Sequence, residues 1–197
     1  MKNRTLIIIL GIAAILLIPG ACNYNRFVNR EETVSTAWGY VQSAYQRRAD
    51  LIPNLVEVVS KAGTYEKSTL ESVVKSRAEA SKITLSADQL SEENLAKFQA
   101  AQSQISSGIG RLLAVAESYP TLQAVQGYRD LMVSLDETEN RIKAERDKFN
   151  SAVKEYNIAV RRFPGNIFAG IFGFEKKAAF QADPGTEKAP KVDFNKP

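Results

Sequence analysis

Apolar residues recur three and four positions apart along most of this chain, a spacing that a helix places on one face. Four such stripes follow one another, over residues 23–62, 65–82, 91–119 and 121–163. Gly63 follows the first stripe and Pro120 the third, and both residue types commonly end helices. The pattern predicts four helices and no strand, and the last helix would be about 65 Å long at about 1.5 Å per residue.

The four stripes favour an elongated, antiparallel up-and-down four-helix bundle, because each helix must cover its apolar face with a neighbour. The last stripe keeps heptad spacing, which is typical of coiled-coil packing. Pro53 falls within the first stripe, where it removes a backbone hydrogen bond and is predicted to bend the helix. We assign residues 23–164 to this bundle as one domain.

The chain begins with a candidate membrane anchor, residues 1–22. Lys2 and Arg4 precede a continuous apolar run over residues 6–18, and small residues continue it to Cys22. Its length lies between that of a signal-peptide core and that of a transmembrane helix. We favour an uncleaved single-pass helix, with Tyr24 at the interface where aromatic residues collect. The alternative is a lipoprotein signal with Cys22 lipidated, although Pro19 stands where that signal favours an aliphatic residue.

The orientation of this anchor depends on the basic residues at its two ends. Lys2 and Arg4 lie close to the apolar run, whereas Arg26 and Arg30 lie farther from its other end. This favours a cytoplasmic amino terminus and an extracytoplasmic bundle, in the cell envelope.

Residues 165–197 form a third region. Its first part, residues 167–174, is an apolar patch too short to span a bilayer. We favour its folding back onto the end of the bundle, and the alternative is an amphipathic foot in the membrane interface. Beyond Phe180 the chain is predicted to be an extended, mobile tail, in which Val192 and Phe194 are candidates for docking as a strand-like clip.

Composition argues against most catalytic chemistry. The chain has no histidine, and Cys22 is its single cysteine, so the usual zinc, haem and thiol sites lack ligands. Carboxylate pairs such as Glu92 and Glu93 are neighbours along a helix and do not converge. The net charge is +4, with basic residues scattered among acidic ones, which is not the pattern of a nucleic-acid-binding surface. We therefore expect no enzyme activity, no cofactor or metal, and no nucleic-acid partner.

Polar residues that interrupt the stripes are the candidate site. Arg48 stands in the first stripe, Gln102 in the third, and Glu139 and Arg146 in the last. We favour a buried polar layer in which these side chains fix the register of the helices, a role known for single polar residues in coiled coils.

The alternative is a recognition site at the predicted bend. There Arg47, Arg48 and Asp50 lie close to Pro53 and Asn54. A pair of arginines can bind a carboxylate or a phosphate group through two parallel hydrogen bonds.

Several motifs together resemble the bacterial LemA family. They are the stretch over residues 46–56 (QRRADLIPNLV), residues 145–150 (ERDKFN), Tyr156-Asn157, residues 161–164 (RRFP) and the KVDF sequence at 191–194. The resemblance implies one amino-terminal membrane segment followed by an elongated helical bundle. It implies no reaction and no catalytic residues. Members are often encoded near membrane proteases or small membrane proteins, which suggests such a protein as a partner.

These observations predict a non-enzymatic, membrane-anchored helical protein, and we favour an adaptor or scaffold for a membrane partner. An adaptor should leave apolar residues exposed after its core is formed, and Tyr40, Val56, Val58 and Val74 are the candidates. The alternative is an envelope structural protein that associates with itself.

Overall fold

A computed structural model describes residues 2–61, 67–117 and 119–181; side chains at positions 2–19, 67, 115, 117, 120 and 121 lie outside the description. The elements are α1 (Lys2–Lys61), α2 (Lys67–Ser81), the short 3-10 helix η1 (Ala87–Gln89), α3 (Glu92–Glu117), α4 (Pro120–Gln123), α5 (Gln126–Arg161) and α6 (Gly165–Phe172). Every element in this part of the chain is helical, which confirms the all-α prediction. The predicted tail, with Val192 and Phe194, lies outside the described residues.

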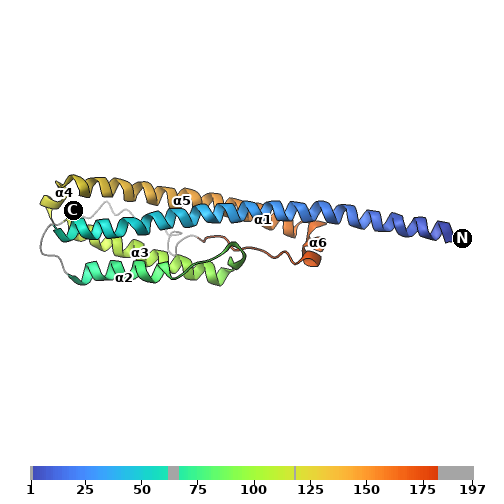
Figure 1. The fold of residues 1–197 in the computed structure, drawn as a ribbon, viewed down its shortest axis with the longest axis horizontal. Coiled ribbons are helices and arrows are strands. Elements are labelled where there is room, and N and C mark those ends of the chain that lie inside the picture. Colours follow the sequence, from blue (N-terminus) through green and yellow to red (C-terminus); the bar gives the residue numbers. More distant parts are fainter. Residues whose placement is uncertain (1, 62–66, 118, 182–197) are drawn as a thin grey trace, which may run out of the picture.

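The helices form two antiparallel pairs in an elongated molecule (Figure 1). α5 lies along α1 for most of its length, and α3 lies along α2. α1 also contacts α2 and α3, so it links the two pairs. The predicted up-and-down order is compatible with this arrangement, and a single four-helix bundle remains a prediction.

The longest helix, α1, runs without interruption from Lys2 to Lys61. It crosses the predicted boundary between anchor and bundle at residues 22 and 23 as one helix, and its amino-terminal part extends beyond the rest of the molecule (Figure 1). It also continues through Pro53, where the neighbouring Ile52 and Leu55 are fully buried and hold the helix by packing. Among the described residues, no helix is long and apolar enough to cross a membrane.

The last long helix is shorter than predicted. The chain first forms α4, which begins with Pro120, a residue suited to the first position of a helix. Val125 then adopts an extended conformation, with φ of −72° and ψ of 123°, and α5 starts at the next residue. Leu122 is fully buried in this connection. Burying it turns the chain across the end of the molecule, and this tertiary contact replaces the continuous helix that the stripe predicts.

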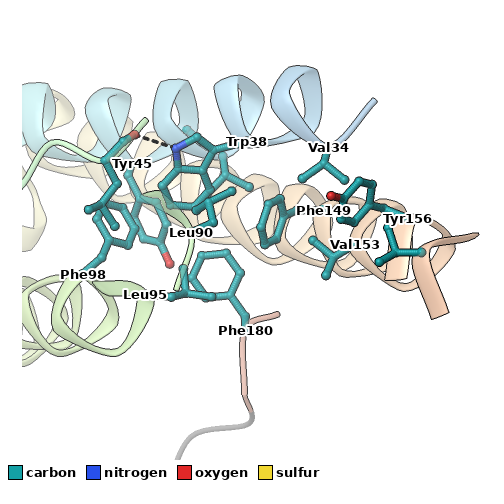
Figure 2. Packing of buried hydrophobic residues seen from close by; sticks show 14 of the residues in the cluster. Val34, Trp38, Tyr45, Leu90, Leu95, Phe98, Phe149, Val153, Tyr156 and Phe180 are labelled. Atoms are coloured by element: carbon teal, nitrogen blue, oxygen red, sulfur yellow. Dashed lines mark hydrogen bonds between the residues drawn. The ribbon is translucent and has the colours of Figure 1, made fainter. Parts of the chain in front are cut away.

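The core consists of two clusters along the length of the molecule. Trp38 is at the centre of the first, with ring centroids 5.2 Å from Phe98 and 5.4 Å from Phe149. Its indole N–H donates to the carbonyl oxygen of Leu85 at 2.8 Å (Figure 2). The second cluster surrounds Ile52 and Leu55 and includes residues of α2, α3 and α5. Most of the predicted stripe positions are buried in one cluster or the other.

Beyond α6, residues 175–181 return along the molecule as an extended segment, which we call the C-terminal strap. Two asparagines of α5 bind its backbone. Asn157 accepts from the N–H of Lys177 at 3.0 Å and donates to its carbonyl oxygen at 2.8 Å. Asn150 pairs in the same way with Phe180, at 2.8 and 3.2 Å. The ring of Phe180 is thereby placed against Trp38 and Phe149 (Figure 2).

The junction between α5 and α6 requires glycine at position 165. A Cβ atom there would lie 2.5 Å from the carbonyl oxygen of Ala159 and 3.5 Å from the ring of Phe27. We expect Gly165→Ala to lower the free energy of unfolding by about 1–3 kcal/mol, the usual cost of overpacking. Gly170→Ala is the matched control in the same helix, because a Cβ atom at position 170 would meet no atom within 4 Å. Urea unfolding that shows equal stability for the two variants would contradict this packing.

Candidate functional site

The side chain of Arg48 is the centre of a polar layer between the two core clusters. It is 2% exposed. One terminal nitrogen, Nη1, donates to Ser106 Oγ at 2.7 Å and to Glu139 Oε1 at 2.8 Å. The other, Nη2, donates to the Gln102 carbonyl oxygen at 3.0 Å and to Gln102 Oε1 at 2.7 Å. We call these four residues the Arg48 layer, and they come from α1, α3 and α5.

The Arg48 layer is suited to fixing how the helices align. The guanidinium group is removed from water. Its terminal nitrogens find hydrogen-bond acceptors only when α3 and α5 are aligned so that their acceptor residues lie beside Arg48. The Glu139 side chain is 47% exposed, so solvent screens this ion pair and the hydrogen bonds to α3 matter at least as much. The guanidinium also lies 5.1 Å from the centre of the Tyr45 ring. Three of the four residues predicted for a polar layer, Arg48, Gln102 and Glu139, therefore meet.

The fourth, Arg146, lies elsewhere. It follows Glu139 by seven residues, about 10 Å along a helix. Its Nη2 donates to the carbonyl oxygen of Gln181 at 3.2 Å, and its guanidinium lies 4.6 Å from the centre of the Phe180 ring. Arg146 thus contacts the C-terminal strap and is not part of the Arg48 layer.

The residues predicted for a recognition bend do not gather around Arg48. Arg47, Asp50, Pro53 and Asn54 are exposed on α1. Asp50 accepts a hydrogen bond from the side-chain amide of Gln46 at 2.7 Å, and Arg77 is its ion-pair partner at 3.8 Å. The Arg48 guanidinium points into the molecule, where protein acceptors bind both of its terminal nitrogens. Its Nε is buried without a hydrogen-bond partner.

Sequence reasoning missed Ser106 and the two asparagines of α5. Ser106 lies off the apolar stripe of α3, and nothing in its spacing marks it as a partner of Arg48. Asn150 and Asn157 belong to the motifs that resemble the LemA family, and their spacing of two helical turns is the available signal. That spacing lets both side chains contact one extended segment.

A larger open depression, of about 730 Å³, lies on α1, and its lining includes Arg47, Asp50 and Asn54 of the predicted recognition site. A second groove lies on the α1 and α5 face, outside the Arg48 layer. Its volume is about 470 Å³, and its lining residues are Tyr40, Ser43, Ala44, Arg47, Arg141, Glu145 and Lys148. The side chain of Tyr40 is 60% exposed. Of the other apolar residues predicted to remain outside the core, Val74 is 47% exposed, whereas Val56 and Val58 pack partly against the second cluster.

Titratable groups in the described residues give little basis for acid–base chemistry. Burial raises the pKa of Tyr156 to about 12, and the nearby Glu31 and Glu175 carboxylates contribute to the same shift. Its hydroxyl is buried without a hydrogen-bond partner. The described part of the chain contains no group of acidic or cysteine residues arranged to bind a metal ion. Cys22 is exposed on α1.

The sequence of this chain matches a known protein family. The model of the LemA family matches residues 37–194, which is most of the chain. The chain belongs to the LemA family. This confirms the resemblance that the motifs carry, and the match includes the helices that form the Arg48 layer.

Related LemA-family chains include proteins named for magnetosomes. Magnetosome proteins MamQ 2 and MamQ 1 of Paramagnetospirillum magneticum are each 31% identical over 178 residues, covering 82% of this chain and 65% of the relative. Magnetosome protein MamQ of Magnetospirillum gryphiswaldense is 28% identical with the same coverage. The LemA-family chain described here thus spans just under two thirds of the length of these relatives.

Proposed function

We propose that this LemA-family protein is a non-enzymatic, membrane-anchored scaffold of the bacterial envelope that presents its helical surface to a protein partner. The observation that carries the proposal is the continuity of α1. The same helix, α1, contains the apolar run over residues 6–18 and then packs along α5. A helix without a break transmits position and orientation from its anchored end to its partner-binding end.

The anchor is proposed as an uncleaved single-pass span that ends near Cys22. It rests on the sequence of residues 6–22, most of whose side chains lie outside the described part of the structure. The amino-terminal part of α1 extends alone beyond α6, which leaves room for lipid on all sides (Figure 1). A lipoprotein attached through the exposed Cys22 is the alternative. The proposed orientation places the remainder of the chain outside the cytoplasm.

The proposed role is non-catalytic because the Arg48 layer, a buried charged cluster in the described part of the chain, binds the helices to one another. Each acceptor of Arg48 belongs to the protein itself, and three helices depend on the same guanidinium. The described groove and core also lack a convergent set of catalytic groups. The relatives named as magnetosome proteins support a role in a cellular assembly.

The partner-binding surface is proposed to be the groove around Tyr40. It combines an exposed aromatic ring with Arg47 and Arg141 on two adjacent helices, while Lys148 in the same groove pairs with Glu145 at 3.0 Å. Aromatic residues and arginine are enriched where proteins bind one another and supply much of the binding energy. A membrane protease or a small membrane protein with an acidic segment would match this surface in charge.

Photo-crosslinking in living cells tests this role. A photoreactive amino acid replaces Tyr40, and a control variant carries it at Ser103, an exposed position on α3. We expect one dominant adduct with another membrane protein from position 40 and none from position 103. Adducts only with further copies of the same chain would overturn the adaptor role and support a self-associating envelope structure. Adducts of equal yield from both positions would show that the groove is not a specific interface.

A further inference from the structure

An apolar surface lies on and around α6, at the place where the amino-terminal part of α1 leaves the other helices (Figure 1). Phe163 is 75% exposed, Ile171 is 69% exposed and Ile167 is 51% exposed. Phe172 and Tyr24, at 43% and 45%, continue this surface onto α1, with ring centroids 5.2 Å apart. So much exposed apolar area in one place indicates a binding surface. We call these five residues the α6 surface.

The α6 surface lies beside the residues of α1 at which the proposed membrane span ends. A Cβ atom on Gly20 would lie 3.3 Å from the ring of Phe168. Gly165, at the start of α6, lies beside Asn23 and Phe27 of α1. α6 therefore packs beside the last residues of the apolar segment of α1, before the chain turns at Gly173. Figure 1 shows α6 beside α1.

Basic residues surround the α6 surface. Arg161 and Arg162 lie at the end of α5, Lys176 follows α6, and Arg26 lies on the adjacent part of α1; all four are exposed. Residues 160–177 contain a single acidic residue, Glu175. On the outer side of α5, Lys154, Arg161 and Arg162 line one groove together with Ile158, whose side chain is 47% exposed. Apolar side chains within a basic border are typical of helices that lie in the interface of an anionic membrane.

We infer that the α6 surface rests in the headgroup region of an anionic lipid bilayer, with Ile167 and Ile171 among the acyl chains and the surrounding arginines at the phosphates. This second contact rests on the proposed anchoring of the chain. Two attachments at different points prevent a single-span protein from rotating freely about its anchor. The α1 and α5 face would then be held at a fixed angle to the membrane, which favours binding to a partner in the same bilayer.

The test measures the depth of α6 in vesicles that contain the full chain. An environment-sensitive fluorophore is attached at Ile171→Cys, or at Ser103→Cys as a control, in a chain that also carries Cys22→Ser. The vesicles contain phosphatidylglycerol and phosphatidylcholine, with a nitroxide quencher at the lipid headgroup. We expect a blue-shifted emission and loss of most fluorescence at position 171, and neither effect at position 103. Circular dichroism confirms that both labelled chains remain helical.

Charge variants test the role of the basic border in the same vesicles. Arg161→Glu with Arg162→Glu should reduce the quenching at position 171. Arg129→Glu with Lys143→Glu changes the charge by the same amount at exposed positions of α5 that lie farther from α6, and it should leave the quenching unchanged. Equal quenching in the two double variants would overturn the proposed contact with anionic headgroups.

The outcomes separate this inference from the proposed anchoring. A chain that enters the vesicles but gives the same fluorescence at positions 171 and 103 would overturn the α6 contact and leave the anchor standing. A chain that does not associate with the vesicles at all would overturn both. Quenching at position 171 in vesicles of phosphatidylcholine alone, as strong as in anionic vesicles, would contradict the electrostatic contribution.

Discussion

Replacing Arg48 with alanine is expected to lower the free energy of unfolding by about 3 kcal/mol, because it removes a buried charged donor that serves two helices. The side-chain oxygen of Gln102 would lose the hydrogen bond from Arg48, its carbonyl oxygen would lose a second donor, and a cavity would open between the two core clusters. Part of the Glu139 contribution is screened by water, since that side chain is 47% exposed. Thermal and urea unfolding followed by circular dichroism measure the effect.

Two further variants distinguish the contribution of the Arg48 layer to stability from that of neighbouring residues. Arg47→Ala removes an exposed arginine from the preceding position of α1, and its stability should change by less than about 0.5 kcal/mol. Arg48→Met keeps much of the volume but leaves the acceptors unpaired, so it should fall between the parent and Arg48→Ala. If Arg48→Met unfolds like the parent and yet abolishes a cellular phenotype, the structural role of the layer is wrong and a recognition role replaces it.

The Trp38→Ala variant is expected to lose about 4 kcal/mol of stability, within the usual range for deleting a large aromatic side chain from a core. Trp38 is 2% exposed and lies within 6.0 Å, between ring centroids, of Phe98, Phe149 and Phe180. These rings come from α3, α5 and the C-terminal strap, so one cavity would loosen three segments. The Leu85 carbonyl oxygen would keep only its second donor, Gln42, at 2.8 Å.

Tyr40→Ala is the control for this prediction, because it removes an aromatic side chain from the same helix at a position that is 60% exposed. Its stability should remain close to that of the parent. Trp38→Phe should lie between the two, since it keeps most of the packing and loses the hydrogen bond to Leu85. Equal stability of the Trp38→Ala and Tyr40→Ala variants would contradict the central place of Trp38 in the core.

The helices could be predicted from sequence because their burial is periodic. Val34, Trp38 and Val41 fall on one face by spacing alone, and all three are buried. The interruption of that pattern by Arg48 and Glu139 likewise marked two members of the polar layer that the structure brings together. Periodicity carries this information since every turn of a packed helix meets the same neighbour.

Features that depend on irregular backbone could not be predicted in this way. The predicted helix is interrupted between Gln123 and Gln126, where Val125 is extended and burial of Leu122 turns the chain. The C-terminal strap has no periodic pattern, and its position depends on single side chains such as Asn150 and Asn157. Arg146 interrupts the same stripe as Glu139, yet it contacts the strap, a segment that no helical pattern reveals.

Attachment to the membrane through residues 1–22 is the central claim, and alkaline carbonate extraction of cell membranes tests it most directly. The full chain is compared with a chain that lacks residues 2–22, and the amino-terminal peptide of the membrane-bound form is measured by mass spectrometry. We predict that the full chain stays in the membrane with an unprocessed amino terminus, while the shortened chain is soluble and helical. Complete extraction of the full chain into the soluble fraction would contradict the claim, and a lipid-modified amino-terminal Cys22 would replace the span with a lipoprotein anchor.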